Sequence, residues 1–311
     1  MRSAAREANR RDRRDPELKR VLFVRNAAAS RGSADLDDAL AYVRELGLEV
    51  DERIPDDAEH MRFLIRAVAR SIDAVLVGGG DGTVNSALKP VLEAGLPLGV
   101  IPLGTANDFA RTLGIPADPY EAFAVVAAQS TRLVDVGWAN NRPFLNAAGI
   151  GLSARIARDL DSVRKRVWGP LSYPLAVLES LRRQRAFRVR LQSPAGTQEF
   201  SSIQVTVGNG VYYGGGARVA TDCAIDDGCL DVLSIRPQPL RRLLAVALAL
   251  RNGSQASGFD VAAGAVFEVA TQPPLTVTLD GEPALPTPVS FRVAPRALRV
   301  FVPGPGSIRG G

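Results

Sequence analysis

The stretch from residue 74 to residue 88 constrains the fold of this chain more than any other part of it. A short apolar run, 74–77, leads into three glycines, and Asp81-Gly82-Thr83 then opens a segment that can be helical. This pattern predicts a strand, a tight turn and a helix start. Glycines let the backbone approach a ligand closely, and a helix N-terminus offers free N–H groups and a positive dipole end. The pattern therefore favours a bound phosphate group.

A second unit of the same kind follows the first. Residues 98–101 read as a strand, and the next residues form a turn around Gly104 before an apolar helical segment starts at Phe109. Two such units in sequence place both helix starts at one edge of a parallel sheet, where open α/β sheets bind ligands. The first turn lacks the Gly-Lys-Ser/Thr ending of a Walker loop, and no G-x-G-x-x-G motif follows the strand at 20–25.

Hydrophobic patterning divides the chain into three parts. Residues 1–19 are mostly charged, which predicts a disordered basic arm. Residues 20–135 alternate short strands with amphipathic helices, which predicts a Rossmann-like α/β nucleotide-binding domain with a parallel sheet. Residues 136–294 contain short β-rich runs punctuated by Gly, Pro, Asn and Asp, with helical segments near 153–183 and 239–252. This texture predicts an antiparallel β-sandwich domain with helical insertions.

Composition excludes several classes of protein. His60 is the only histidine, so neither a histidine-based triad nor a multi-histidine metal site can form. We expect His60 itself to be a solvated surface residue. The two cysteines fit neither a redox motif nor a zinc motif. Because no apolar run is long enough to span a bilayer and no secretory signal is present, we expect a cytoplasmic protein.

One basic segment points to a membrane surface. Between residues 155 and 190, Arg164, Lys165 and Arg166 lie beside the aromatic residue Trp168. Basic side chains interleaved with amphipathic aromatics suit an anionic membrane, although a solvated helix face has the same composition. We expect peripheral association with the inner face of the membrane. Nucleic acid is not an expected partner, because base-stacking aromatics and recognised nucleic-acid modules are missing.

The two glycine turns resemble the diacylglycerol kinase catalytic-domain family, which includes the YegS-type soluble bacterial lipid kinases and the sphingosine kinases. The resemblance rests on Gly79-Gly80-Asp81-Gly82-Thr83 and, more specifically, on Pro102-Leu103-Gly104-Thr105-Ala106-Asn107-Asp108-Phe109-Ala110-Arg111. Further motifs of the family match at 146–151, 208–216, 224–232, 279–283 and 295–303.

Four positions depart from the usual pattern of the family. Ser86 stands where glutamate is usual, Ser153 stands where many members have aspartate, and Ile54 lies near where some members present a threonine. The usual Asn-Pro-x-x-Gly after the first strand is replaced by a sequence that keeps only Asn26.

The resemblance implies ATP and Mg²⁺ as cofactors and an active site in the cleft between two domains. It also implies that the closing strand, residues 295–303, returns to the first domain. The residues that it assigns to nucleotide binding are Asn26, Gly79, Gly80, Asp81, Gly82, Thr83, Asn85, Gly104, Thr105, Asn107 and Asp108.

The turn at Asp280-Gly281-Glu282 carries the general base in this family. Two carboxylates flanking one glycine could share a metal ion and a proton-accepting role, and no histidine can replace them. We favour Asp280 as the base, with Glu282 as the alternative base or as a metal partner. Asp81, at the tip of the first glycine turn, is expected to meet Mg²⁺ or its water ligands, a role that suits a carboxylate.

A second acidic turn surrounds Asp227. The resemblance implies that Asp227, with backbone oxygens near Ala224 and Cys229, holds a structural Mg²⁺ away from the phosphates. A plain hairpin turn explains the same residues without a metal ion.

These features predict an ATP-dependent kinase that phosphorylates a lipid hydroxyl, with diacylglycerol as the default substrate. Two alternatives remain open. An NAD kinase-like enzyme would share Gly-Gly-Asp-Gly-Thr but not the second turn. A catalytically silent lipid- or nucleotide-binding protein would account for the departures at Ser86, Ser153 and Ile54. The sequence does not identify the lipid, and a homodimer is left open.

Overall fold

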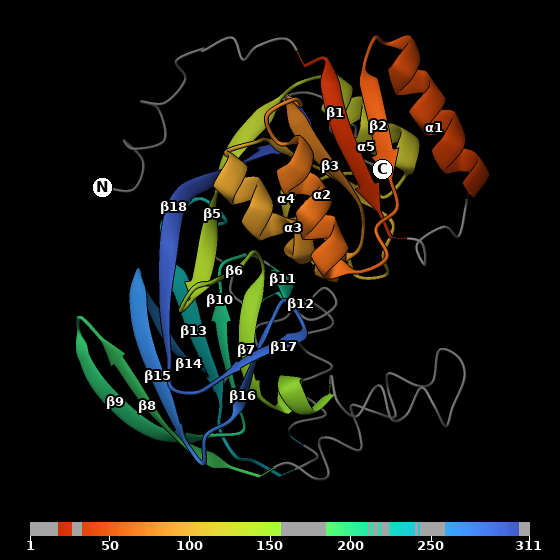
Figure 1. The fold of residues 1–311 in the computed structure, drawn as a ribbon. Helices are drawn as coiled ribbons and strands as arrows, with labels where there is room; N and C mark the ends of the chain where they lie inside the picture. Colours follow the sequence, from red (N-terminus) through yellow and green to blue (C-terminus); the bar gives the residue numbers. More distant parts are fainter. Residues whose placement is uncertain are drawn as a thin grey trace.

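The structure is a computed structural model that describes residues 18–26, 33–156, 185–210, 212–213, 217–218, 224–239, 242 and 259–304. Figure 1 shows an α/β domain above a β-rich domain, with the long strands β5 and β18 running between them. The helices are α1 (Ser33–Glu45), α2 (Ala58–Val68), α3 (Asp81–Ala94), α4 (Asp108–Leu113) and α5 (Pro119–Ala127). The strands are β1 (Arg20–Arg25), β2 (Glu49–Arg53), β3 (Ala74–Gly79), β4 (Leu98–Pro102), β5 (Thr131–Ala139), β6 (Arg142–Phe144), β7 (Ala147–Gly151), β8 (Phe187–Ser193), β9 (Gly196–Ser202), β10 (Gln204–Gly208), β11 (Tyr212–Tyr213), β12 (Ala217–Arg218), β13 (Leu230–Ile235), β14 (Phe259–Gly264), β15 (Val266–Gln272), β16 (Thr276–Leu279), β17 (Glu282–Pro286) and β18 (Val289–Phe301).

The first domain is built on a parallel sheet in the order β2-β1-β3-β4. Every residue of β3 and β4 is buried, because helices cover both faces of the sheet, and such strands read as continuous apolar runs. On one face α1 packs against α5, and on the other α2 packs against α3. The predicted parallel α/β domain is confirmed.

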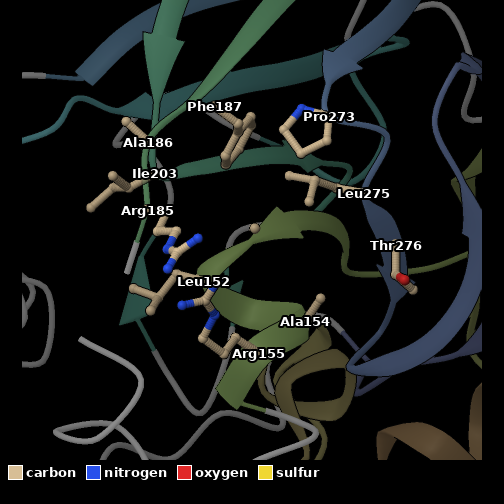
Figure 2. Close-up of a pocket in the computed structure, with 11 residues that line it drawn as sticks. Leu152, Ala154, Arg155, Arg185, Ala186, Phe187, Ile203, Pro273, Leu275 and Thr276 are labelled. Carbon is tan, nitrogen blue, oxygen red and sulfur yellow. The ribbon is translucent and has the colours of Figure 1, made fainter. Parts of the chain in front are cut away.

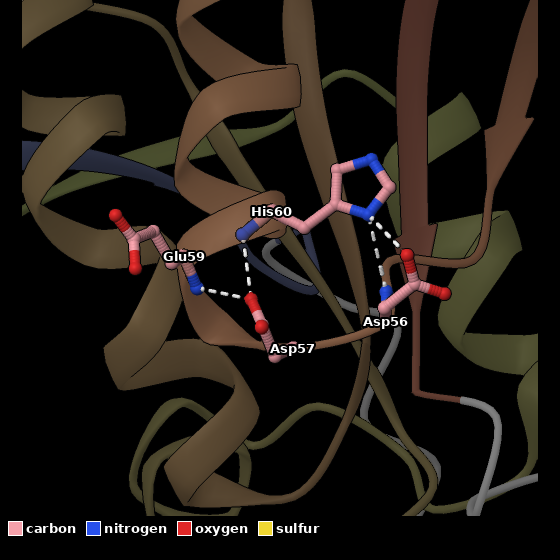
Figure 3. Close-up of polar contacts among 4 residues, drawn as sticks. All are labelled: Asp56, Asp57, Glu59 and His60. Atoms are coloured by element: carbon pink, nitrogen blue, oxygen red, sulfur yellow. Dashed lines mark hydrogen bonds and ion pairs between the residues drawn. The ribbon is translucent and has the colours of Figure 1, made fainter.

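The start of α2 shows how the local sequence sets an element boundary (Figure 3). The Asp57 carboxylate accepts the backbone N–H groups of His60, at 2.7 Å, and Glu59, at 2.8 Å, and so caps the helix. The hydrogen bond from the His60 amide holds the pKa of Asp57 below its usual value. The His60 ring Nδ1 lies 3.0 Å from Oδ2 of Asp56, and the ring is 38% exposed. The only histidine of the chain is therefore a surface residue.

The second domain packs two sheets face to face. One sheet is antiparallel, in the order β14-β13-β10-β7-β16-β17. The other contains β9, β8 and β15, and β8 alternates buried and exposed residues as expected for a strand with one face on the core. Phe144, Phe187, Phe267 and Phe291 belong to the buried cluster between the sheets. The predicted antiparallel sandwich is also confirmed.

Strand β18 ties the two domains together. Residues 289–292 lie beside β15 and residues 291–301 beside β5, both antiparallel, whereas Val300 pairs in parallel with Leu98 of β4. Strands from both domains thus belong to one ten-stranded sheet. The division predicted between residues 135 and 136 falls inside β5, so the chain has no flexible linker there.

The structure differs from the predicted elements at a few places. The single strand predicted over 143–150 is two strands, β6 and β7, which are separated at Asn146. At this break, backbone N–H groups donate to a side chain instead of a neighbouring strand. It also divides 199–208 at Ile203, beside a hydrogen bond from the Ser202 hydroxyl to the Gln204 carbonyl.

One residue of the predicted basic arm lies in the folded first domain. Leu18, which the prediction places in the basic arm, is 7% exposed and packs into the core of the first domain. The remainder of that arm and most of the helical segments predicted at 153–183 and 239–252 lie outside the described residues.

Candidate active site

The candidate site lies at the carboxyl edge of the parallel sheet. Gly79 of β3 pairs with Pro102 of β4, and Gly78 pairs with Arg25 of β1, so the three strands end at the same level. Asn26 follows β1 at this edge, and its backbone N–H donates to the Gly78 carbonyl at 3.1 Å. The glycine turns predicted from the sequence therefore start side by side.

Close packing explains the glycines in both turns. A Cβ on Gly79 would lie 2.5 Å from the Thr83 hydroxyl oxygen, and a Cβ on Gly104 would lie 2.5 Å from the Gly80 Cα. Asn107 braces the second turn, since its side chain accepts the Gly104 N–H at 3.1 Å and donates to the Gly104 carbonyl at 2.9 Å. The two turns are thus pressed against each other without side chains between them.

Asp81 joins these turns to the second domain. Its carboxylate accepts the backbone N–H groups of Asp108 and Phe109, each at 3.0 Å, and so caps α4. It also accepts Nδ2 of Asn146 at 3.1 Å. A carboxylate offers about four lone-pair positions, so the donors within the described residues leave one position for a cation or water.

Asp280 lies at the tip of the turn between β16 and β17, in a left-handed conformation with φ of 46°. Its Oδ1 accepts the N–H groups of Asn146, at 2.8 Å, and Ala147, at 3.0 Å. Its Oδ2 accepts the Leu145 N–H at 2.9 Å and Nδ2 of Asn85 at 2.8 Å. Three fixed backbone donors from the second domain and one side-chain donor from the first domain therefore converge on this carboxylate.

The environment of Asp280 suits a proton acceptor. Burial raises the pKa of its carboxyl to about 6, although the three backbone N–H donors lower it, and the negative charge of Asp81 raises it further. A general base works best when its pKa lies near the operating pH. Asp280 is therefore ionised at neutral pH yet basic enough to accept a proton.

Glu282 occupies a different place on the same turn. It is exposed, and its Oε1 lies 3.5 Å from the position that a Cβ on Gly82 would take. Glu282 thus reaches across the cleft to the first turn of α3, whereas Asp280 lies inside the ring of amides. Both carboxylates remain candidates for the base, and Glu282 is better placed than Asp280 to share a cation with phosphates at α3.

The second acidic turn has another geometry. Asp227 Oδ1 accepts the Cys229 N–H at 2.9 Å, and Oδ2 accepts the Ala224 N–H at 3.2 Å. The three residues predicted to bind a metal ion thus lie together, because the backbone N–H groups of Ala224 and Cys229 donate to the Asp227 carboxylate. Asp226 pairs with Arg132 at 2.7 Å, and Asp135, whose pKa burial raises, accepts the Gly228 N–H.

Sequence reasoning missed one residue of the cleft. Asn146 is 5% exposed. Its backbone N–H donates to Asp280 and its side-chain amide donates to Asp81, so it contacts both of these carboxylates. The available signal was the family-like motif at 146–151, which begins with this asparagine. Asn85, predicted to bind nucleotide, donates to Asp280 instead.

The departures from the family pattern have local explanations. The Ser86 hydroxyl donates to the Gly82 carbonyl of its own helix at 2.9 Å. Ser153 exchanges hydrogen bonds with the side chain of Gln204. Ile54 is 46% exposed.

A cavity of about 250 Å³ lies at the other end of β7, within the second domain. Figure 2 shows Leu152, Phe187, Ile203 and Leu275 among its lining residues, with Arg155 and Arg185 also on its wall. β7 connects the two places, because Ala147 donates to Asp280 and Gly151 lines the cavity. Four residue steps along a strand separate them by about 13 Å.

The described residues contain neither a cluster of metal-binding side chains nor a membrane-spanning helix. In this part of the chain, no three His, Cys, Asp or Glu side chains gather to hold a metal ion, and no helix is both long and apolar enough to cross a bilayer. Arg164, Lys165, Arg166 and Trp168 lie outside the described residues, so their membrane role stays a prediction.

Known proteins resemble this chain over most of its length. The diacylglycerol kinase catalytic domain family matches residues 20–139, and the YegS C-terminal NAD kinase beta sandwich-like domain family matches residues 146–302. A protein of Pseudomonas aeruginosa named probable lipid kinase YegS-like is 33% identical over 288 residues, which cover 91% of this chain and 94% of that protein. A protein of the same name from Stenotrophomonas maltophilia is 30% identical over 301 residues, covering 91% and 96%. A solved structure of a candidate diacylglycerol kinase from Bacillus anthracis superposes with a TM-score of 0.81 at 25% identity, covering 92% and 98%.

Proposed function

The chain belongs to the diacylglycerol kinase catalytic-domain family with a YegS-type second domain and is a lipid kinase, and on this premise we propose that it transfers the γ-phosphoryl group of ATP to a hydroxyl of diacylglycerol. One observation carries the proposal. The glycine turns of the first domain face the Asp280 turn of the second, and the Asn85–Asp280 hydrogen bond of 2.8 Å joins the two sides. A phosphate donor and a proton acceptor thus share one cleft.

The first turn suits the phosphates of ATP. The N-cap residue of α3 is Gly80, which has no side chain to cap the helix, so the first N–H groups of α3 remain for an anion. The contact of Gly80 with Gly104 lets both backbones approach a triphosphate. Both features support the assignment of Asn26, Gly79 to Thr83 and Gly104 to Asp108 to this site.

Magnesium fits as an ion held largely by the nucleotide. Mg²⁺ is usually bound by one or two carboxylates together with substrate phosphates, and bound Mg²⁺ would neutralise charge on those phosphates. Asp81 keeps one lone-pair position without a described donor, and Glu282 lies over the start of α3. Asp81 and Glu282 are therefore the residues that would hold it.

Asp280 takes the proton in the proposed reaction. The acceptor hydroxyl oxygen forms a bond to the γ-phosphorus, the bond from that phosphorus to the bridging oxygen breaks, and ADP leaves with the electron pair. The hydroxyl proton passes to the Asp280 carboxylate, which burial keeps basic. Because four donors already occupy its lone-pair positions, the hydroxyl must displace one of them. Positioning and charge stabilisation supply most of the catalysis in reactions of this kind.

The apolar cavity beside β7 is proposed to hold an acyl chain of the acceptor. Its walls include Leu152, Phe187, Ile203 and Leu275, and it lies about 13 Å along β7 from the base. Ile203→Trp would fill part of this space. We expect it to raise KM for a long-chain diacylglycerol while leaving KM for a short-chain analogue unchanged, and equal effects on both would remove the cavity from the proposal.

Membrane association is proposed to be electrostatic and reversible. The basic cluster Arg164-Lys165-Arg166 motivates it, since exposed charges attract anionic lipids and are screened within about 8 Å at physiological salt. Replacing all three with alanine should weaken binding to anionic vesicles and leave the weak binding to neutral vesicles unchanged. Undiminished binding to anionic vesicles would exclude this cluster.

The function is tested by supplying labelled ATP and Mg²⁺ with diacylglycerol vesicles or with NAD. We expect the label in the lipid extract. Label in NADP alone would contradict the proposal and favour the NAD kinase-like alternative, and binding of ATP and lipid without turnover would favour the silent alternative. A cellular lipid extract analysed by mass spectrometry then identifies the preferred acceptor.

A further inference from the structure

Two carboxylates of the site, Asp81 and Asp280, are each bound by an asparagine from the opposite domain. Asn85 of the first domain donates to Asp280 of the second at 2.8 Å, and Asn146 of the second donates to Asp81 of the first at 3.1 Å. Because a carboxylate only accepts hydrogen bonds, the nitrogen of each asparagine must face it. The alignment of both carboxylates therefore depends on the two domains together.

Asn85 differs from the other three donors to Asp280. The N–H groups of Leu145, Asn146 and Ala147 belong to the backbone at the start of β7, so they cannot leave without disturbing that strand. Asn85 uses a side chain on α3. It is the one donor in this set that belongs to the domain carrying the glycine turns.

We propose, on the basis of the proposed function, that Asn85 is a positioning residue for Asp280. Its amide orients Oδ2 of the carboxylate and stabilises its charged form only when the first domain lies against the second in this arrangement. The nucleotide turn begins four residues before Asn85 on the same helix, at Asp81. When the first domain holds its nucleotide in place, Asn85 therefore also supplies the fourth hydrogen bond to the Asp280 carboxylate of the second domain.

This role separates Asn85 from nucleotide binding, which the sequence pattern assigns to it. A residue that contacts ATP should change KM for ATP when it is replaced. A residue that acts through Asp280 should lower kcat instead and leave KM for ATP within about twofold. The loss should be about 10- to 100-fold, which corresponds to one hydrogen bond to a charged group.

Two substitutions distinguish hydrogen bonding from packing. Asn85→Ala removes the amide, whereas Asn85→Asp keeps its shape and replaces the donor with a second acceptor. We expect Asn85→Asp to lose at least as much kcat as Asn85→Ala. Ser86→Ala is the matched control, because the neighbouring hydroxyl bonds within its own helix, and its kcat should stay within about twofold of the wild type.

The decisive measurement is single-turnover transfer from labelled ATP to diacylglycerol, with Asn85→Ala tested alone and combined with Asp280→Asn. If Asn85 acts through Asp280, adding Asn85→Ala to Asp280→Asn should change the residual rate less than twofold. Losses that multiply, an Asn85→Asp enzyme with normal kcat, or a raised KM for ATP at unchanged kcat would each overturn the inference. A wild-type rate in Asp280→Asn alone would instead contradict the proposed function, so the two failures can be told apart.

Discussion

Two turns of this protein carry nearly the same residues and are built in different ways. Asp227 precedes Gly228 and accepts N–H groups from residues two and three positions away in the chain. Asp280 precedes Gly281 and accepts N–H groups from residues 133 to 195 positions away. The Asp227 carboxylate is thus bound within its own turn, whereas the Asp280 carboxylate is bound by both domains.

This difference separates a structural feature from a functional one. A local turn satisfies its carboxylate at the surface, so the charge of that carboxylate costs little. The Asp280 carboxylate is partly buried, and this shielding from water raises its pKa to about 6 despite four donors. Perturbed carboxylates in clefts mark functional sites more often than surface turns do.

The largest expected effect comes from Asp280→Asn. The substitution removes the base, and general-base assistance is typically worth about 10²- to 10⁴-fold, so kcat should fall by that factor. Steady-state kinetics with labelled ATP measures it. A kcat within threefold of the wild type would show that the turn is structural after all.

This variant needs a check on folding. The new amide nitrogen replaces one acceptor oxygen, and it must face either the donors from Leu145 and Asn85 or those from Asn146 and Ala147. The melting temperature and the affinity for ATP should therefore be measured on the same sample. Retained ATP binding with lost turnover is the expected combination.

The pH dependence of the rate is the next largest effect. The base must be ionised, and the pKa of Asp280 is raised to about 6. The value of kcat/KM should therefore be level above about pH 7 and fall about tenfold per pH unit well below pH 6. An acid limb centred near pH 4 would instead point to a carboxyl group in water.

Alanine at the two turn glycines compares the turns directly. Gly281 and Gly228 have φ of 91° and 73°, and a Cβ would meet nothing within 4 Å at Gly281 and only Pro295, at 3.9 Å, at Gly228. Both substitutions should cost about 1 kcal/mol of unfolding free energy through backbone strain. We expect only Gly281→Ala to lower kcat, by about tenfold, because it moves Asp280 and Glu282. Equal losses of kcat in both variants would erase the distinction between the turns.

The smallest effect is expected for Asp227→Asn. Its carboxylate accepts two exposed backbone N–H groups, so chemical denaturation should show a loss of about 1 kcal/mol or less. At saturating Mg²⁺ the kcat should stay within about twofold. A steep rise in the Mg²⁺ concentration required for activity would instead identify a metal ion at Asp227, as the family resemblance implies.

Most of the fold could be predicted from hydrophobic periodicity. Buried parallel strands such as β3 and β4 are short apolar runs between turn residues, and β8 alternates because one of its faces meets solvent. The break at Asn146 could not be predicted, because it depends on a carboxylate 134 positions away. No local sequence pattern predicts that β18 pairs with strands of both domains.

The main residues of the site could be predicted from the sequence, but their hydrogen-bond partners could not. The glycine turns and the two carboxylates of the Asp280 turn each have a local signature. The partners of these side chains do not, since Asn85 looks like one more residue of the nucleotide turn and Asn146 looks like a strand residue. Hydrogen bonds that cross 65 to 195 positions are properties of the packed domains.

The central claim is that Asp280, held by amides from both domains, accepts the proton, whereas Glu282 does not. Single-turnover transfer of labelled phosphate to diacylglycerol by Asp280→Asn and Glu282→Gln, measured side by side at pH 7.5 and saturating Mg²⁺, tests it most directly. We predict a loss of about 10²- to 10⁴-fold for Asp280→Asn and of less than tenfold for Glu282→Gln, with ATP binding retained in both. A near-normal rate in Asp280→Asn together with a collapsed rate in Glu282→Gln would contradict the account and assign the base to Glu282.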